Sequence, residues 1–180
     1  AIRNGSASVV TDHIDHFTKD GILLKSGATL EADIIVTATG LNLVTLGEIE
    51  FMVDGNEIDF AQTWTYKGLA YSDVPNLVST FGYINASWTL RADVVSNYTC
   101  RLLNHMKKTG TQQATPRLRA QDQGMTARPW IDDFSAGYMQ RMMHLMPRQG
   151  DHAPWINPQL IAVDKQMIVK SPIDDGAMQF

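Results

Sequence analysis

The sequence contains one cysteine, Cys100, among its 180 residues. A single thiol cannot form an internal disulfide or a cysteine-only metal site, so both are excluded. No stretch approaches the roughly 20 apolar residues of a membrane-spanning helix, and no signal peptide with a basic start and an apolar core begins the sequence. These absences favour a cytoplasmic protein without a transmembrane segment.

Common catalytic and metal-binding motifs are missing as well. The sequence has no Gly-x-Ser-x-Gly, no Walker phosphate loop, no Gly-x-Gly-x-x-Gly and no His-x-x-x-His pair. The formal net charge is −4, which argues against general nucleic-acid binding. We therefore assign no catalytic acid, base or nucleophile and no metal ligand, and we expect Cys100 to act as a small apolar residue in a helix.

Strand patterns dominate the first half of the chain. Residues 7–38, in which apolar and polar residues alternate between short glycine turns, predict an antiparallel β-meander. The run 34–38 is apolar on both faces, so we expect a buried, central strand there. The Asp-Gly-Asn sequence at 54–56 predicts a hairpin turn, and residues 76–81 are typical of another buried strand.

A long helix is predicted over residues 88–108. Ser87 is suited to cap its start and Gly110 to end it. Its expected inward-facing positions are Ala92, Val95, Thr99, Leu102, Leu103 and Met106.

The remaining sequence predicts an irregular, partly helical tail. Residues 111–133 are polar with scattered prolines, while 135–146 and 157–167 each favour a short helix. The expected fold class is therefore α+β: an antiparallel or mixed sheet with one long packed helix, followed by the tail.

Two turns of small residues are candidates for close contact with a flat ligand. The first, at the end of the predicted central strand, is Ala38, Thr39 and Gly40. The second, at the start of the predicted helix, is Asn85, Ala86, Ser87, Trp88 and Thr89. A helix start presents unpaired N–H groups that suit an electron-rich carbonyl oxygen, such as one on a flavin ring. A tight turn and an ordinary strand-to-helix connection are the alternatives.

An ordered series of segments resembles the flavin-containing and Baeyer–Villiger monooxygenases, which are class B flavoprotein monooxygenases. The segments are Gly21-Ile-Leu-Leu, Leu30-Glu-Ala-Asp-Ile-Ile-Val-Thr-Ala-Thr-Gly40, Tyr66-Lys-Gly-Leu-Ala-Tyr-Ser-Asp-Val-Pro-Asn76, Phe81-Gly-Tyr-Ile-Asn-Ala-Ser-Trp-Thr89, and the tail from Trp130 to Trp155. The tail is similar to the bacterial branch that oxidises ketones and thioamides. The resemblance covers nearly the whole chain and matches the C-terminal part of such an enzyme.

This resemblance implies an oxidoreductase that uses FAD and NADPH to transfer one oxygen atom from O2 to a lipophilic ketone, or to nitrogen or sulfur. Residues 1–110 would supply strands and a helix of the flavin domain and the edge of the nicotinamide domain, and residues 111–180 would cover the substrate. Both candidate turns would lie near the flavin. Lys67 could screen a cofactor phosphate, and a solvated loop lysine is the alternative. The two glycine fingerprints of the family are absent, so we expect the 180 residues alone to be inactive.

Three alternatives remain at this point. The chain could be a non-catalytic module that associates with itself or a partner through an exposed apolar surface. It could also belong to another flavoprotein with two dinucleotide-binding domains. Separately, the methionine-rich helix at 135–146 could form core packing or, with Trp130, Phe134 and Trp155, the wall of a lipophilic pocket.

Overall fold

The computed structural model describes residues 1–132 and 135–180, so Phe134 lies outside the described residues. The chain divides into two units, Ala1–Gly40 and Leu41–Phe180. Each unit is described by itself.

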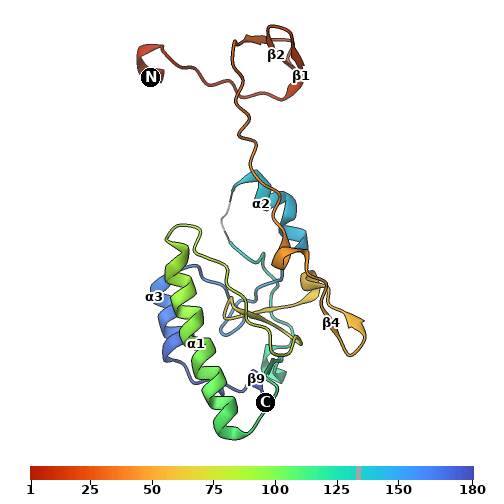
Figure 1. Ribbon diagram of the computed structural model, residues 1–180, viewed down its shortest axis with the longest axis vertical. Coiled ribbons are helices and arrows are strands. Elements are labelled where there is room, and N and C mark those ends of the chain that lie inside the picture. The colour runs from red at the N-terminus through yellow and green to blue at the C-terminus, as the bar shows by residue number, and fades with distance from the viewer. Residues whose placement is uncertain (133–134) are drawn as a thin grey trace. The chain divides into compact units, whose positions relative to one another are not determined.

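The first unit contains a three-stranded antiparallel sheet in the order β1-β2-β3, drawn at the red end of the ribbon (Figure 1). The strands are β1 (Ile14–Thr18), β2 (Gly21–Leu24) and β3 (Thr29–Glu31). Gly21 is required where β2 begins, because a Cβ there would lie 1.9 Å from the carbonyl oxygen of Leu30. The predicted meander is therefore confirmed between residues 14 and 31.

The prediction of a buried strand at 34–38 is wrong. These residues form no strand, and Ile34 and Val36 are 82% and 83% exposed. A strand needs a hydrogen-bonded neighbour, and β3, which ends at Glu31, pairs only with β2 among the described strands. Residues 76–81, also predicted to be a strand, run in irregular conformation.

The described residues of the second unit form three separate two-stranded antiparallel sheets. They pair β4 (Met52–Val53) with β5 (Asn56–Glu57), β6 (Thr65–Tyr66) with β7 (Ala70–Tyr71), and β8 (Thr115–Pro116) with β9 (Met178–Gln179). The hairpin turn predicted at 54–56 is confirmed between β4 and β5. The α+β class is also confirmed, but small sheets replace the single sheet that the sequence predicted.

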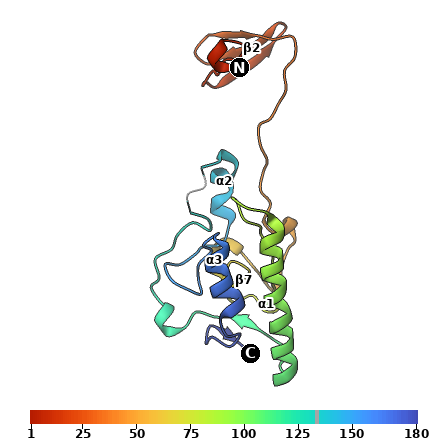
Figure 2. The ribbon, with the colours of Figure 1, turned by 90° about the vertical axis from the view of Figure 1, so that its left-hand side faces the viewer.

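Helix α1 (Trp88–Thr109) is the long helix predicted from the sequence, with Ser87 at its start. Gly110 ends it in a left-handed conformation and donates its N–H to Met106. Figures 1 and 2 show α1 beside the blue segment made of α3 (Ile161–Asp164) and the π-helical turns Lys165–Lys170.

The buried face of α1 differs in part from the predicted stripe. It consists of Arg91, Val94, Val95, Tyr98 and Leu102. Val95 and Leu102 are therefore confirmed as inward-facing, whereas Leu103 is 58% exposed. Cys100 is exposed rather than packed. The polar Arg91 occupies a buried position because it has an ionic partner there.

The main core lies between α1, β6–β7 and the C-terminal segment, and includes Tyr66, Tyr98, Trp155 and Ile168. A second cluster combines Trp130 with Met139 and Met146 around α2 (Gly137–Met142). The remaining short helical turns are Ile2–Asn4, Thr45–Glu48, Phe60–Gln62, Ala120–Asp122 and Met143–Leu145. Among the described helices, none has the length and apolar character needed to cross a membrane.

Candidate functional site

The five residues before and at the start of α1, 85–89, form an exposed turn, which we call the 85–89 turn. Within the described residues, the hydroxyl of Ser87 does not cap the helix; it lies 2.7 Å from the hydroxyl of Thr89 instead. No acidic side chain stands in the first helical turn. The Leu90 amide donates to the Ser87 carbonyl at 3.2 Å, and the amides of Trp88 and Thr89 before it can donate to an acceptor from outside at the positive end of this 22-residue helix.

Aromatic residues surround the start of the helix. The Phe81 ring lies 5.0 Å from that of Trp88 and 4.6 Å from that of Trp130. A Cβ on Gly82 would lie 2.1 Å from the Trp88 ring, so glycine permits this packing. These aromatic rings line a cavity of about 270 Å³ together with Leu43, Tyr71 and Met146. The 85–89 turn therefore borders an apolar hollow large enough for a small organic group.

Arg91 lies beneath the turn, fully buried in the first part of α1. Its guanidinium forms an ion pair with Asp164 of α3, whose side chain is also fully buried. The guanidinium also donates to the carbonyl oxygens of Lys67 and Gly68 at 3.1 and 3.3 Å. Burial raises the pKa of Asp164, and the attraction of Arg91 opposes that rise. Arg91 was not predicted from the sequence, where it is only a charged residue in a helix.

Lys67 is a buried residue and not the solvated loop lysine that the sequence suggested. Its side chain is 2% exposed, and its ammonium lies 2.9 Å from a carboxylate oxygen of Asp175 and 2.9 Å from the hydroxyl oxygen of Ser171. It also lies 5.0 Å from the centre of the Tyr66 ring. Burial lowers the pKa of Lys67, while Asp175 opposes the shift. The ammonium is thus already paired in the interior.

The other candidate turn belongs to the first unit. Ala38, Thr39 and Gly40 are exposed and irregular, and Gly40 has a φ of 84°. The conformation at Gly40 is one that glycine adopts readily. These residues end the unit Ala1–Gly40, whereas the 85–89 turn belongs to Leu41–Phe180.

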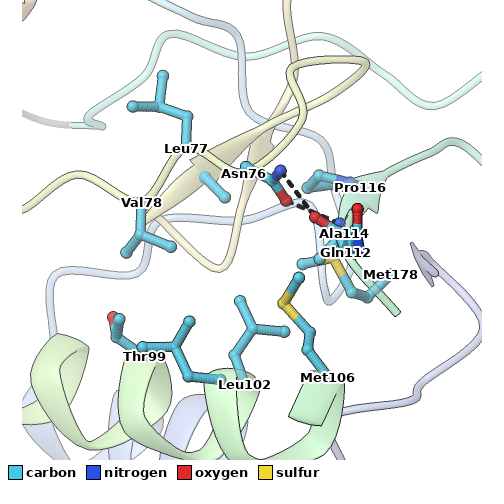
Figure 3. Close-up of a pocket in the computed structure, with 12 residues that line it drawn as sticks. Asn76, Leu77, Val78, Thr99, Leu102, Met106, Gln112, Ala114, Pro116 and Met178 are labelled. Atoms are coloured by element: carbon cyan, nitrogen blue, oxygen red, sulfur yellow. Dashed lines mark hydrogen bonds between the residues drawn. The ribbon is translucent and has the colours of Figure 1, made fainter. Parts of the chain in front are cut away.

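A second cavity, of about 440 Å³, lies against the other half of α1 (Figure 3). Leu102 and Met106 point toward it from the helix, and Val78 points toward them from the opposite side. Its polar rim is already satisfied: the Asn76 side chain donates to the Gln112 carbonyl at 3.1 Å and accepts from the Ala114 amide at 2.9 Å. This cavity suits an apolar group and offers no reactive side chain.

The residues proposed from the sequence as a lipophilic wall are divided between two clusters. Trp130, Met139 and Met146 pack together, whereas Trp155 is fully buried beside Tyr66 in the main core. Among the described residues, no group of three or more histidine, cysteine or acidic side chains could hold a metal ion. The 85–89 turn and its aromatic cavity therefore remain the best candidate site.

Comparison with known proteins identifies the class of protein to which the chain is similar, the FAD-containing monooxygenases. The sequence is 46% identical over 179 residues to MymA of Mycobacterium tuberculosis and 45% identical to EthA of Mycolicibacterium smegmatis, both named as FAD-containing monooxygenases. It is 42% identical over 179 residues to AlmA of Acinetobacter baylyi, named as an FAD-binding monooxygenase. These matches confirm the resemblance described from the sequence.

Each of these matches covers 99% of the chain but 36% of the relative. The chain thus spans about a third of the length of the monooxygenases that it matches. No protein-family model matches the sequence, and no solved structure matches it significantly.

Proposed function

We propose that this chain forms part of a monooxygenase that uses FAD and NADPH to transfer one oxygen atom from O2 to a ketone, or to nitrogen or sulfur. The observation that carries the proposal is the 46% identity to an FAD-containing monooxygenase along 99% of the chain. The parent would be an α/β flavoprotein with two dinucleotide-binding domains. Residues 1–110 would complete the flavin domain and the edge of the nicotinamide domain, and residues 111–180 would help to cover a lipophilic substrate.

The 85–89 turn fits one part of FAD, the flavin ring. Its exposed residues include the small Ala86 and Ser87, and the uncapped amides of α1 suit a carbonyl oxygen of the ring's pyrimidine portion. The turn at 38–40 would approach the ring through backbone alone. The ammonium of Lys67 is held by Asp175, so a role in screening a phosphate is not part of the proposal.

Bound FAD would supply the redox and oxygen chemistry, while residues of this chain would orient the ring and exclude water from it. The sequence contains no Gly-x-Gly-x-x-Gly to cradle a pyrophosphate. We therefore propose that FAD and NADPH are held mainly by polypeptide beyond these 180 residues, and that the 180 residues alone are inactive.

The test is to replace the matching segment of MymA with this chain and to purify the chimera. We expect it to retain FAD and to oxidise NADPH faster when a methyl ketone or a thioether is added, with the oxygenated product detected by mass spectrometry. MymA lacking the segment serves as the control and should do neither. A folded chimera that retains no FAD would refute the proposal.

A second candidate function is association through apolar surface without catalysis. In the first unit, all five residues of β1 are exposed, including Phe17 at 56%. Such a sheet buries too little apolar surface to be stable by itself. If association is the function, sedimentation of the 180 residues should show a dimer or larger species whose proportion rises with concentration. A monomer at all concentrations would exclude self-association, and binding of FAD by the chimera would favour the monooxygenase.

A further inference from the structure

A continuous polar network lies beneath the 85–89 turn. It begins at Arg91, which is fully buried, forms an ion pair with Asp164 and donates to the side-chain oxygen of Asn157 at 3.3 Å. Asn157 in turn donates to the carbonyl of Trp130 at 3.1 Å. The network therefore connects α1 to α3 and to the segment that contributes Trp130 to the aromatic cavity.

Gln159 carries this network to the turn itself. Its side-chain nitrogen donates to the Asn157 oxygen at 3.2 Å, and its side-chain oxygen accepts the backbone N–H of Ile84 at 3.1 Å. Ile84 immediately precedes the turn. Gln159 has a φ of 54°, a backbone conformation that residues other than glycine adopt only where surrounding contacts hold them.

The residue before Ile84 is held by the same network. The ring of Tyr83 lies 5.4 Å from the guanidinium carbon of Arg91, within the range of a cation–π contact, and Tyr83 is 2% exposed. The turn thus has fixed points on both sides: Tyr83 and Ile84 before it, and Arg91 after it. Its own residues are exposed, and apart from the packing of the Trp88 ring against Phe81 they would otherwise be free to move.

We propose that Arg91, Asn157 and Gln159 are positioning residues that hold the 85–89 turn in the geometry in which the first amides of α1 meet a carbonyl oxygen of the flavin ring. The part of this inference that concerns the flavin rests on the proposed function. Donors that are fixed before the ligand arrives need no reorganisation on binding, so loss of their support weakens binding without removing any atom that touches the ligand.

The first test uses the 180 residues without a cofactor. Amide hydrogen exchange should be measured in the unsubstituted chain, in Gln159→Ala, and in the control Gln166→Ala, which removes an exposed glutamine from the neighbouring π-helical turns. Loss of one hydrogen bond should raise the exchange rate at Ile84 and through the 85–89 turn by about three- to tenfold in Gln159→Ala. Exchange in the middle of α1, around Tyr98, should stay unchanged in both variants. Unchanged exchange at the turn would overturn the inference.

The second test measures FAD affinity in the MymA chimera carrying the same substitutions. We expect Gln159→Ala to raise the dissociation constant for FAD by about three- to tenfold and to shift the visible absorbance of the bound flavin. The control Gln166→Ala should give the same dissociation constant and absorbance as the unsubstituted chimera. Arg91→Lys, which keeps the charge but loses the fork of donors, should have a larger effect in the same direction.

The outcomes separate the two proposals. If the unsubstituted chimera folds but does not bind FAD, the proposed function fails, and the flavin part of this inference fails with it. If the unsubstituted chimera binds FAD and Gln159→Ala binds it equally well with an unchanged spectrum, the proposed function stands and the positioning role is refuted. Because Gln159 is only half-buried, its substitution should leave the fold intact even if Arg91→Lys does not.

Discussion

In the ion pair Lys67–Asp175, we expect removal of Lys67 to cost much less stability than removal of Asp175. Asp175 has other donors besides Lys67: the Tyr66 hydroxyl at 2.7 Å and the amides of Ala177 and Met178, both at 3.1 Å. Without Lys67, the carboxylate would still accept three hydrogen bonds. Lys67→Met also preserves the length of an apolar stem, so we expect a cost of about 1–2 kcal/mol.

Asp175→Ala should cost more, because it leaves an ammonium in the interior. Lys67 would keep one hydroxyl partner, Ser171, and contacts with aromatic rings. A buried lysine can escape this penalty by losing its proton. At about 1.36 kcal/mol per pKa unit, discharging a lysine of pKa about 10.4 at pH 7 costs about 4.6 kcal/mol. Since that route limits the penalty, we expect Asp175→Ala to cost about 3–5 kcal/mol.

Urea denaturation followed by tryptophan fluorescence is the suitable assay. All four tryptophans lie in the second unit, so the signal reports the unit that contains the pair. Lys165→Met and Asp174→Ala are matched controls, because both side chains are exposed, and each should change stability by less than about 0.5 kcal/mol. If Lys67→Met proves as costly as Asp175→Ala, the reasoning from the remaining donors of Asp175 is wrong.

The same variant has a characteristic pH dependence. In Asp175→Ala, the folded pKa of Lys67 would lie well below its unfolded value, because burial lowers it and no carboxylate opposes the shift. Between those two pKa values the unfolded state binds more protons than the folded state, so stability rises with pH. The deficit of Asp175→Ala relative to Lys67→Met should therefore shrink between pH 7 and pH 9. A deficit that stays constant would show that Lys67 does not lose its proton.

Two further perturbations test the surroundings of the site. Gly68→Ala should lower the unfolding free energy by more than about 2 kcal/mol, because φ is 66° and the added Cβ would lie 2.2 Å from the Arg91 guanidinium. In the control Gly55→Ala, φ is 82° but the added Cβ would have nothing within 4 Å, so the cost should be only about 1 kcal/mol. Thermal melts of both variants would measure the difference. The carboxylate of Asp122 raises the pKa of His152, so the stability that this contact provides should be complete below about pH 6.5 and lost as the pH rises through the folded pKa. A pH series of unfolding curves should show this decline in the unsubstituted chain and not in His152→Gln.

Features specified by neighbouring residues could be predicted from the sequence. The end of α1 depends on Gly110, which acts within one helical turn of the boundary, and the start at Ser87 was predicted although its hydroxyl makes no capping hydrogen bond. The hairpin between β4 and β5 likewise depends on its own turn residues. The 85–89 turn was identified as a candidate site for the same reason, since a helix start can be recognised locally.

The strand predicted at 34–38 shows where such local reasoning fails. Its composition favours β structure, but a strand exists only when another strand supplies hydrogen bonds, and that partner cannot be read from the run itself. Among the described strands, none pairs with these residues. Ile34 and Val36 are therefore exposed, although their β-branched side chains favour a strand.

Lys67 and Arg91 could not be interpreted from the sequence because their partners lie far along the chain. Ser171 follows Lys67 by 104 residues, and Asp164 follows Arg91 by 73. A lysine in a glycine-containing loop and an arginine in a helix are most often exposed, and only the tertiary fold brings each to a carboxylate.

The turn formed by Lys67 and Gly68 joins these two buried ionic systems. Both residues have positive φ, at 53° and 66°. The carbonyl oxygens of both accept from Arg91, while the Lys67 side chain reaches Asp175. One backbone turn therefore supports the start of α1 and fixes the C-terminal segment at the same time. Because both systems share this turn, we expect substitutions at Gly68 to disturb the 85–89 turn and the Asp175 contact together, although no residue of the 85–89 turn is changed.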